Sequence, residues 1–228
     1  MEWHQKEEII LSFIKTIFEE IIAENPTLPI RVGARGGAEI SDILEDKFVQ
    51  KAENKENIFK VGGAPKGQTK NPYDIYFVYE FSSLEQQLVW IDIKATNLFY
   101  KDSNPDMGTY KKFIKFFGSG NYFAIYCQLA YLPKGEELQF VQTPQDEIVT
   151  VFLLKDIHHS FRIQPNNQIQ VNYAAPSEPR SLREFIDLLK SKVQESLERK
   201  KKIIEREMKN LDNEFESIKQ TVQNTLSR

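Results

Sequence analysis

The stretch that decides the fold is Asn71–Asn97, which reads NPYDIYFVYEFSSLEQQLVWIDIKATN. It contains two apolar runs, at 74–81 and 87–94, separated by the short polar sequence Ser82–Glu85. Runs rich in β-branched and aromatic residues favour strands, and a short polar break between them favours a hairpin. The sequence therefore predicts two antiparallel neighbours, with the start of the first strand beside the end of the second.

Charged residues interrupt these strands at three positions. Asp74 opens the first strand directly after Pro72-Tyr73, while Asp92 and Lys94 lie two residues apart inside the second. Residues i and i+2 of a strand share a face, so Asp92 and Lys94 point the same way. Two charges on a largely apolar strand are costly unless they are paired, bound to a metal or placed at a cleft. The alternative is an exposed Asp–Lys pair on an edge strand.

An acid-x-Lys triplet alone is weak information, because this chain contains five of them. Four lie in charged helical or loop sequence, where a solvated face explains them. Asp92–Lys94 differs because it interrupts an apolar strand and because Asp74 adds a second carboxylate beside it. Carboxylate oxygens at a wet site favour Mg²⁺, which can acidify a bound water and polarise a phosphate. The three residues therefore predict a magnesium-dependent phosphodiesterase in which Lys94 orients the attacking water.

The spacing of these residues resembles a known superfamily. Pro-Tyr-Asp, seventeen residues, and then Asp-Ile-Lys is similar to the motif of the PD-(D/E)xK nucleases. The order WIDIKATN, GTYKKFI, NYFAIYCQLAYL looks most like type II restriction endonucleases of the EcoRV and HincII branch. The resemblance covers roughly residues 30–132. It departs from the strict motif at Tyr73, where an Asp would directly follow the Pro.

This resemblance implies a fold and a function. The expected fold is α/β, a restriction-endonuclease-like core with a mixed central β-sheet flanked by helices and a C-terminal helical extension. The expected activity is Mg²⁺-dependent, sequence-specific hydrolysis of double-stranded DNA by a homodimer. A companion DNA methyltransferase is expected in the same system, without a stable complex. The alternatives are a repair, junction-resolving or transposition nuclease of the same superfamily, or a non-catalytic DNA-binding or scaffold protein.

Such nucleases often supply another acid from a helix before the first catalytic strand. Here the helix after Gly36-Gly37 offers Glu39 and Glu45. With Ile40, Ile43, Leu44 and Phe48 taken as the buried face, Glu39 lies at its border and Glu45 more nearly opposite. Glu39 is therefore the predicted additional metal ligand. Its position in the first helical turn is equally explained by the helix dipole.

The predicted DNA contacts lie on both sides of the catalytic strands. Net charge is −3, yet the flanking stretches carry a local excess of basic residues, and binding depends on the local field. Each contact is individually weak, since basic residues in loops are usually just solvated. The predicted DNA-binding residues are Arg31, Arg35, Lys60, Lys66, Lys70, Thr96 and Asn97.

The rest of the chain divides into a predicted core, residues 1–180, and a helical extension, residues 181–228. Residues 5–24 predict a helix, 54–71 an exposed connection, 106–117 a short helix, and 121–132, 147–154 and 168–173 further strands. The single cysteine, Cys127, lies in an apolar run and fits a core position in a cytoplasmic protein. No acidic residue or cysteine lies near His158-His159 in the sequence at the spacing of metal ligands, so an ordinary structural pair is expected.

The extension lacks Gly and Pro and carries an apolar seam with alternating steps of four and three. Three arrangements fit it: a helix that packs the seam against its own domain, a dimerisation arm, and an antiparallel hairpin broken near residues 199–202. The seam residues are Ile204, Met208, Leu211, Phe215, Ile218 and Val222.

Overall fold

A seven-stranded sheet forms the centre of the computed structural model, which describes residues 1–30, 36–65, 71–99 and 104–226. The strand order is β1-β7-β6-β4-β3-β2, and β8 pairs with β6 beyond the end of β7. Only β4 and β6 run parallel within this sheet, so it is mixed. The strands are β1 (Thr27–Leu28), β2 (Ile58–Gly63), β3 (Ile75–Ser82), β4 (Glu85–Asn97), β6 (Phe123–Lys134), β7 (Glu137–Val141) and β8 (Thr150–Leu153).

The predicted hairpin in the deciding stretch is confirmed. β3 and β4 pair antiparallel from Ile75↔Ile91 to Ser82↔Glu85, with a turn between them. Ile75, Phe77 and Val89 are fully buried, as the alternation of a half-buried strand requires. The head of β3 consequently lies beside the middle of β4, at Ile91.

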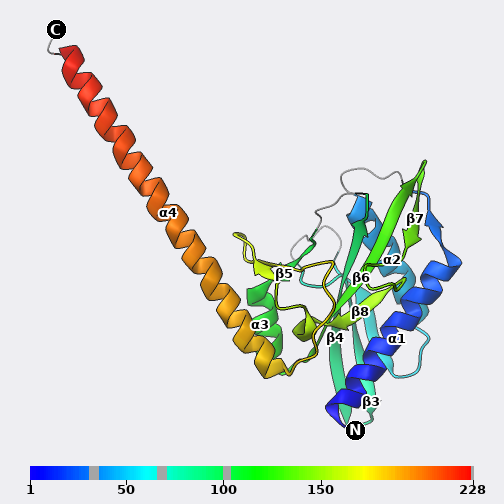
Figure 1. Ribbon diagram of the computed structural model, residues 1–228. Coiled ribbons are helices and arrows are strands. Elements are labelled where there is room, and N and C mark those ends of the chain that lie inside the picture. The colour runs from blue at the N-terminus through cyan, green and yellow to red at the C-terminus, as the bar shows by residue number, and fades with distance from the viewer. Residues whose placement is uncertain (31–35, 66–70, 100–103, 227–228) are drawn as a thin grey trace.

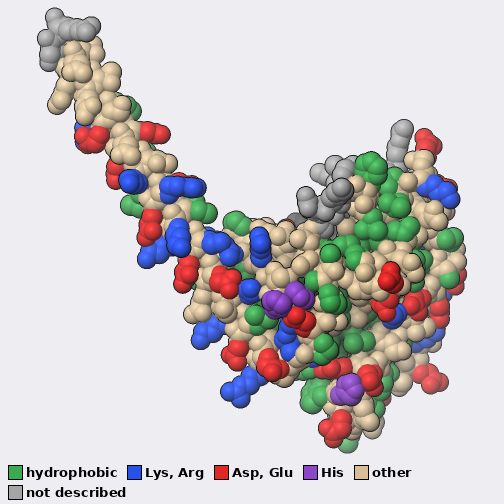
Figure 2. All heavy atoms as spheres, in the orientation of Figure 1, with side chains coloured by type: hydrophobic (Ala, Val, Ile, Leu, Met, Phe, Trp, Pro, Cys, Tyr) green, Lys and Arg blue, Asp and Glu red, His purple; other side chains and the backbone are tan. Residues whose placement is uncertain are grey.

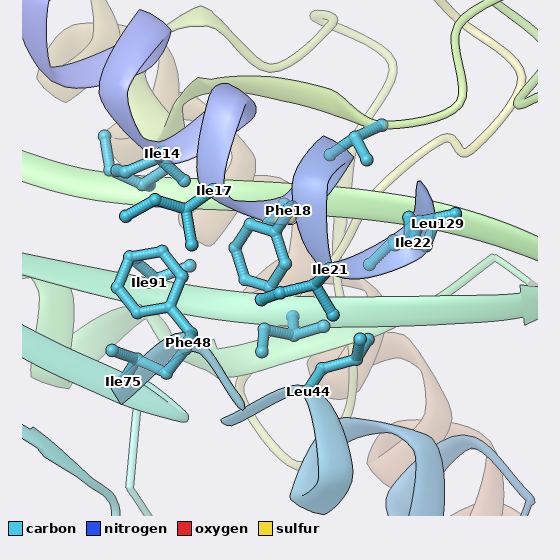
Figure 3. Close-up of a cluster of buried hydrophobic side chains, with 14 of the residues drawn as sticks. Ile14, Ile17, Phe18, Ile21, Ile22, Leu44, Phe48, Ile75, Ile91 and Leu129 are labelled. Atoms are coloured by element: carbon cyan, nitrogen blue, oxygen red, sulfur yellow. The ribbon is translucent and has the colours of Figure 1, made fainter. Parts of the chain in front are cut away.

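Helices cover both faces of this sheet (Figure 1). On one face lie α1 (Trp3–Glu24) and α2 (Gly36–Ala52), whose apolar residues pack on β3, β4 and β6. Figure 3 shows Phe18 of α1 and Phe48 of α2 directed onto the strands that carry Ile91 and Leu129. On the other face lie α3 (Tyr110–Gly118), a 3₁₀ turn (Leu154–Asp156) and the first turns of α4 (Leu182–Leu226). The expected layered α/β fold is therefore confirmed.

A second, three-stranded antiparallel sheet lies next to α3. It has the order β5-β10-β9, formed by β5 (Asp106–Thr109), β9 (Arg162–Ile163) and β10 (Gln168–Gln170). Its residue Ile169 is fully buried and belongs to the same cluster of buried apolar side chains as Phe113 of α3. This small sheet brings residues 106–109 and 166–168 to the same edge of the molecule, which no local sequence pattern announces.

Three local predictions are wrong. The connection expected over residues 54–71 contains strand β2, because Ile58 is buried and the backbone pairs with β3. The helix expected from Asp106 starts only at Tyr110, because 106–109 pair with β10 instead. Strand β7 was not expected at all, and it pairs with the distal half of β6. Cys127 is buried, as predicted.

The C-terminal extension is one uninterrupted helix, α4, of 45 residues. The hairpin broken near residues 199–202 is therefore wrong. Packing of the seam against the chain's own domain is also wrong, since every residue from Lys201 to Thr225 is exposed. Figure 1 shows this half of α4 extending away from the body. No helix among the described residues is long and apolar enough to cross a bilayer.

Candidate active site

Asp74 is held at the junction between β2, β3 and β4. Its backbone N–H donates to the carbonyl of Ile91 at 2.8 Å, and its carbonyl accepts from Ala64 at 2.7 Å. Its side chain turns toward β4, where Oδ2 accepts the backbone N–H of Ile93 at 2.6 Å. The hairpin thus delivers the Asp74 carboxylate next to residues 92–94, as the sequence predicted.

Asp92 and Lys94 meet on one face of β4. Lys94 Nζ donates to Asp92 Oδ1 at 2.6 Å, and Asp92 is only 5% exposed. The second carboxylate oxygen, Asp92 Oδ2, is buried and has no hydrogen-bond partner among the described residues. A buried charged oxygen without a partner is expensive, about 1–3 kcal/mol or more. Because β4 is a central strand of the sheet, the Asp92–Lys94 pair does not lie on an edge strand, and that alternative is wrong.

The electrostatics of the three residues are tightly linked. Burial is the main cause that raises the pKa of Asp92, and the charge of Asp74 also raises it. Lys94 lowers it, and the net pKa is about 7. Burial also raises the pKa of Asp74, although Lys94 and the Ile93 amide oppose this. For Lys94, burial lowers the pKa but the carboxylates of Asp92 and Asp74 outweigh it, so the net shift is upward. One lysine thus faces two desolvated carboxylates that repel each other.

Behind Asp92 lies a second unpartnered polar group. Tyr126 is the residue opposite Asp92 in the parallel β4–β6 ladder, and it is fully buried. Its hydroxyl has no hydrogen-bond partner within the described parts of the chain. Burial and the nearby charge of Asp92 raise its pKa well above the usual value. Two buried oxygens, Asp92 Oδ2 and the Tyr126 hydroxyl, therefore have no hydrogen-bond partner among the described residues.

The three residues open onto a pocket of about 400 Å³. Asp106 of β5 contributes a further carboxylate, and its charge raises the pKa of Lys94. Sequence reasoning gave Asp106 no role, because only the pairing of β5 with β10 brings it to the site. The described residues that line the pocket are Asn71, Asp74, Asp92, Lys94, Asp106, Met107, Gly108, Thr109, Lys112, Asn166 and Gln168.

This donor set fits a hard divalent cation. Asp74 and Asp92 supply carboxylate oxygens, which are the ligands that Mg²⁺ prefers. A cation there would give the unpartnered Asp92 Oδ2 a ligand and would relieve the repulsion that keeps the pKa of Asp92 high. Asp74 and Asp92 are thus the residues suited to hold the metal.

The predicted buried face of α2 agrees with the structure at Ile40, Leu44 and Phe48, which are fully buried, but that face also includes Glu45. Glu39 is exposed, whereas Glu45 is 8% exposed and lies against β2. Ile43 is only partly buried, so the buried face is centred on Leu44 and includes the side of Glu45. Neither glutamate lines the pocket. The acid of α2 whose charge reaches Asp74, raising its pKa, is Asp42.

The predicted DNA contacts have mixed outcomes. Arg31, Arg35, Lys66 and Lys70 lie outside the described residues. Lys60 is exposed on β2, where its φ of 50° puts it in the left-handed region. Thr96 and Asn97 are 6% and 8% exposed, and Asn97 Oδ1 accepts the backbone N–H of Phe99 at 3.0 Å. These two buried side chains have structural roles, so a direct contact with DNA is not supported for them.

His158 and His159 do have an acidic companion, brought from 19 residues away. Glu178 Oε1 lies 2.8 Å from His159 Nδ1 and 3.3 Å from His158 Nε2. Arg180 neutralises the same carboxylate at 2.6 Å. Among the described residues, one ligand atom each from His158, His159 and Glu178 lies within 4.8 Å of the other two, and the two imidazole rings are tilted by 35° with centroids 4.2 Å apart. The cluster ties the loop after the 3₁₀ turn to the segment before α4.

Comparison with known proteins gives one family match. Residues 2–211 match the family model SwaI-like, described as SwaI restriction endonuclease. Among solved structures, the chain is similar to the NlaIV restriction endonuclease, with a TM-score of 0.47 and 11% sequence identity, covering 85% of this chain and 80% of that one. No curated protein matches the chain.

Proposed function

The chain belongs to the SwaI-like family of type II restriction endonucleases, and from this premise we propose that Asp74, Asp92 and Lys94 form its magnesium-dependent catalytic site. The family match implies double-stranded DNA as substrate. The arrangement of Asp74, Asp92 and Lys94 supports the proposal that the chain is a member of the PD-(D/E)xK superfamily. The resemblance to the EcoRV and HincII branch within that superfamily stays a prediction.

Each residue has a role that follows from its position. Asp74 and Asp92 hold the cation, with Asp74 fixed by the Ile93 amide and Asp92 by Lys94. Bound there, Mg²⁺ would supply an acidified water and neutralise charge on the phosphate. Lys94 Nζ reaches the pocket as a fully protonated donor, because the two carboxylates raise its pKa. It orients the attacking water and offsets negative charge that develops on the phosphate.

Among all observations, the unpartnered Asp92 Oδ2 supports this function most directly. A purely structural Asp–Lys pair would satisfy both carboxylate oxygens, since unsatisfied buried polar atoms are rare in folded proteins. Within the described parts of the chain, one oxygen accepts a hydrogen bond from Lys94 and the other has no donor, so it can take a ligand. A non-catalytic DNA-binding protein gains nothing from buried acids near phosphates.

Additional features of the proposal concern partners. Cutting both strands of a symmetric site requires two active sites, which a homodimer with two-fold symmetry supplies. A methyltransferase of matching specificity protects the host DNA without a stable complex. In α2, neither the predicted acid Glu39 nor Asp42, whose charge reaches Asp74, lines the pocket, so we assign the metal to Asp74 and Asp92.

The test is digestion of unmethylated and methylated plasmid and phage DNA with the purified protein, followed by mapping of the ends. We expect discrete fragments with Mg²⁺, none with a chelator, and protection by methylation at the target. Dependence on mismatches, junctions or ends would instead identify a repair or junction nuclease. Binding without any metal-dependent cleavage on all these substrates would contradict the proposal.

A further inference from the structure

The exposed half of α4 is a long helix with an unpartnered apolar seam. From Lys201 to Leu226 it extends about 40 Å at 1.5 Å per residue. Exposed apolar side chains repeat along it at heptad spacing, and Figure 2 shows them among charges of both signs. They are Ile204 (55% exposed), Met208 (61%), Leu211 (52%), Phe215 (57%), Ile218 (57%) and Val222 (49%).

The seam lies on the part of α4 that projects beyond the body. Phe185 and Leu189 are buried, and Ser196 Oγ donates to the carbonyl of Ile163 at 3.1 Å, which fixes the first turns of α4 on the body. From Lys201 to Thr225 every residue of α4 is exposed, so the seam is accessible to a partner helix.

The charges beside the seam argue against two possible occupants. Beyond the basic run Arg199–Lys202, residues 203–226 carry five Asp or Glu and three Lys or Arg. This acidic stretch, which holds the seam, is repelled by the phosphates of DNA and by anionic membranes. A heptad seam instead fits a helix with the same spacing, because knobs of one helix fill holes of the other. A second copy of α4 offers this spacing in register.

The flanking charges favour a parallel pair. In a parallel coiled coil, position g of one helix lies near position e of the next heptad on the other. This brings Glu214 to Lys219 of the second copy and Lys200 to Glu205 of the second copy, against one repulsion, Glu207 with Asp212. An antiparallel pair centred on the seam retains the attraction of Glu205 with Lys219 but sets Asp212 against Asp212 and Glu214 against Glu214.

We infer that residues 203–226 of α4 form a parallel coiled coil with α4 of a second copy of this chain. The bodies then lie at the same end of the coil. This arrangement rests on the proposed function in one respect: two nuclease bodies at one end can serve the two strands of one duplex. The second half of this seam, from residue 212, lies beyond the part of the chain that matches the family.

The first experiment measures the mass of the full chain in solution. We expect the wild type to have twice the chain mass of 26.6 kDa at micromolar concentration. Leu211→Asp, in the seam, should weaken dimerisation at least 100-fold, whereas Asn213→Asp, on the opposite side of the same turn, should leave the dimer intact. Circular dichroism checks that both variants fold. A monomeric wild type, or a Leu211→Asp variant that dimerises like the wild type, would overturn the inference.

The second experiment tests the orientation. Ile204→Cys places two thiols in contact in a parallel pair but about 27 Å apart in an antiparallel one, where residue 204 faces 222. The native Cys127 is buried and does not interfere. Mild oxidation should give a covalent dimer, and a stable dimer that does not cross-link would exclude the parallel arrangement.

Cleavage products separate this inference from the proposed function. The Leu211→Asp variant retains the complete site, so with Mg²⁺ it should nick plasmid DNA and make at least ten-fold less linear product than the wild type. A wild-type dimer joined through α4 that never nicks DNA would contradict the nuclease and leave the coiled coil standing. A monomeric wild type that cuts both strands would contradict the coiled coil and support the nuclease.

Discussion

At the scale of single residues, the site buries two carboxylates side by side, and a bound cation would offset their repulsion. Asp92 is buried beside Asp74, and one lysine compensates for both. Such a site lowers the stability of the metal-free protein, since desolvated like charges repel. Asp74, Asp92 and Lys94 were predictable because they interrupt apolar strands in a short hairpin. Asp106 and Asp42 were not, because tertiary packing alone brings their charges within reach of the site.

The Asp92 carboxyl predicts a pH-dependent stability of the metal-free protein. Its pKa of about 7 exceeds the unfolded value of about 4, so folding takes up a proton between these values. The stabilising effect is complete below about pH 4 and is lost as the pH rises through 7. Asp92→Asn should therefore raise the free energy of unfolding at pH 8 by about 1–3 kcal/mol and flatten its decline with pH. Urea titrations at pH 5 and pH 8 measure this, with Asp46→Asn as an exposed control.

At the scale of elements, the strand hairpin was predictable and its surroundings were only partly so. β3 and β4 have a period of two and a local turn, which the sequence displays. β2 was hidden because Lys60, Gly62 and Gly63 give it the composition of a loop, although its backbone pairs with β3. The small sheet was hidden for another reason, since β5 and β10 are about 60 residues apart and very short. Non-local pairing of this kind leaves no pattern in either segment.

Gly63 of β2 lies directly against Glu45 of α2, so a larger residue at this position should clash with the helix. A Cβ at this position would lie 1.8 Å from Oε1 and 2.9 Å from Cγ of Glu45, a buried side chain. Gly63→Ala should therefore destabilise the protein by about 1–3 kcal/mol, and the additional change Glu45→Ala should recover part of that loss. Gly118→Ala is the matched control, because no atom lies within 4 Å of the added group. Thermal unfolding gives all three values, and an equally stable Gly63→Ala variant would contradict the contact.

At the scale of the whole molecule, the chain combines one catalytic body with one projecting helix. The body places its pocket where β3, β4, β5 and the β9–β10 turn meet, and the proposed catalytic residues line it, with Asp92 and Lys94 on the central strand β4. The seam of α4 was visible in the sequence as a heptad pattern, yet its direction was not. Only the structure shows that Phe185 and Leu189 hold the first turns of α4 on the body and that the seam beyond Lys201 is exposed.

The most direct test of the account compares DNA cleavage and DNA binding by the wild type and Lys94→Ala. With Mg²⁺, we expect the variant to cut a plasmid at least about 100-fold more slowly, while its affinity for DNA in Ca²⁺ changes by only a few-fold. Lys111→Ala, an exposed lysine of α3, should match the wild type in both assays. Cleavage by Lys94→Ala at the wild-type rate, or a proportional loss of cleavage and binding, would contradict a catalytic role for the Asp74–Asp92–Lys94 site.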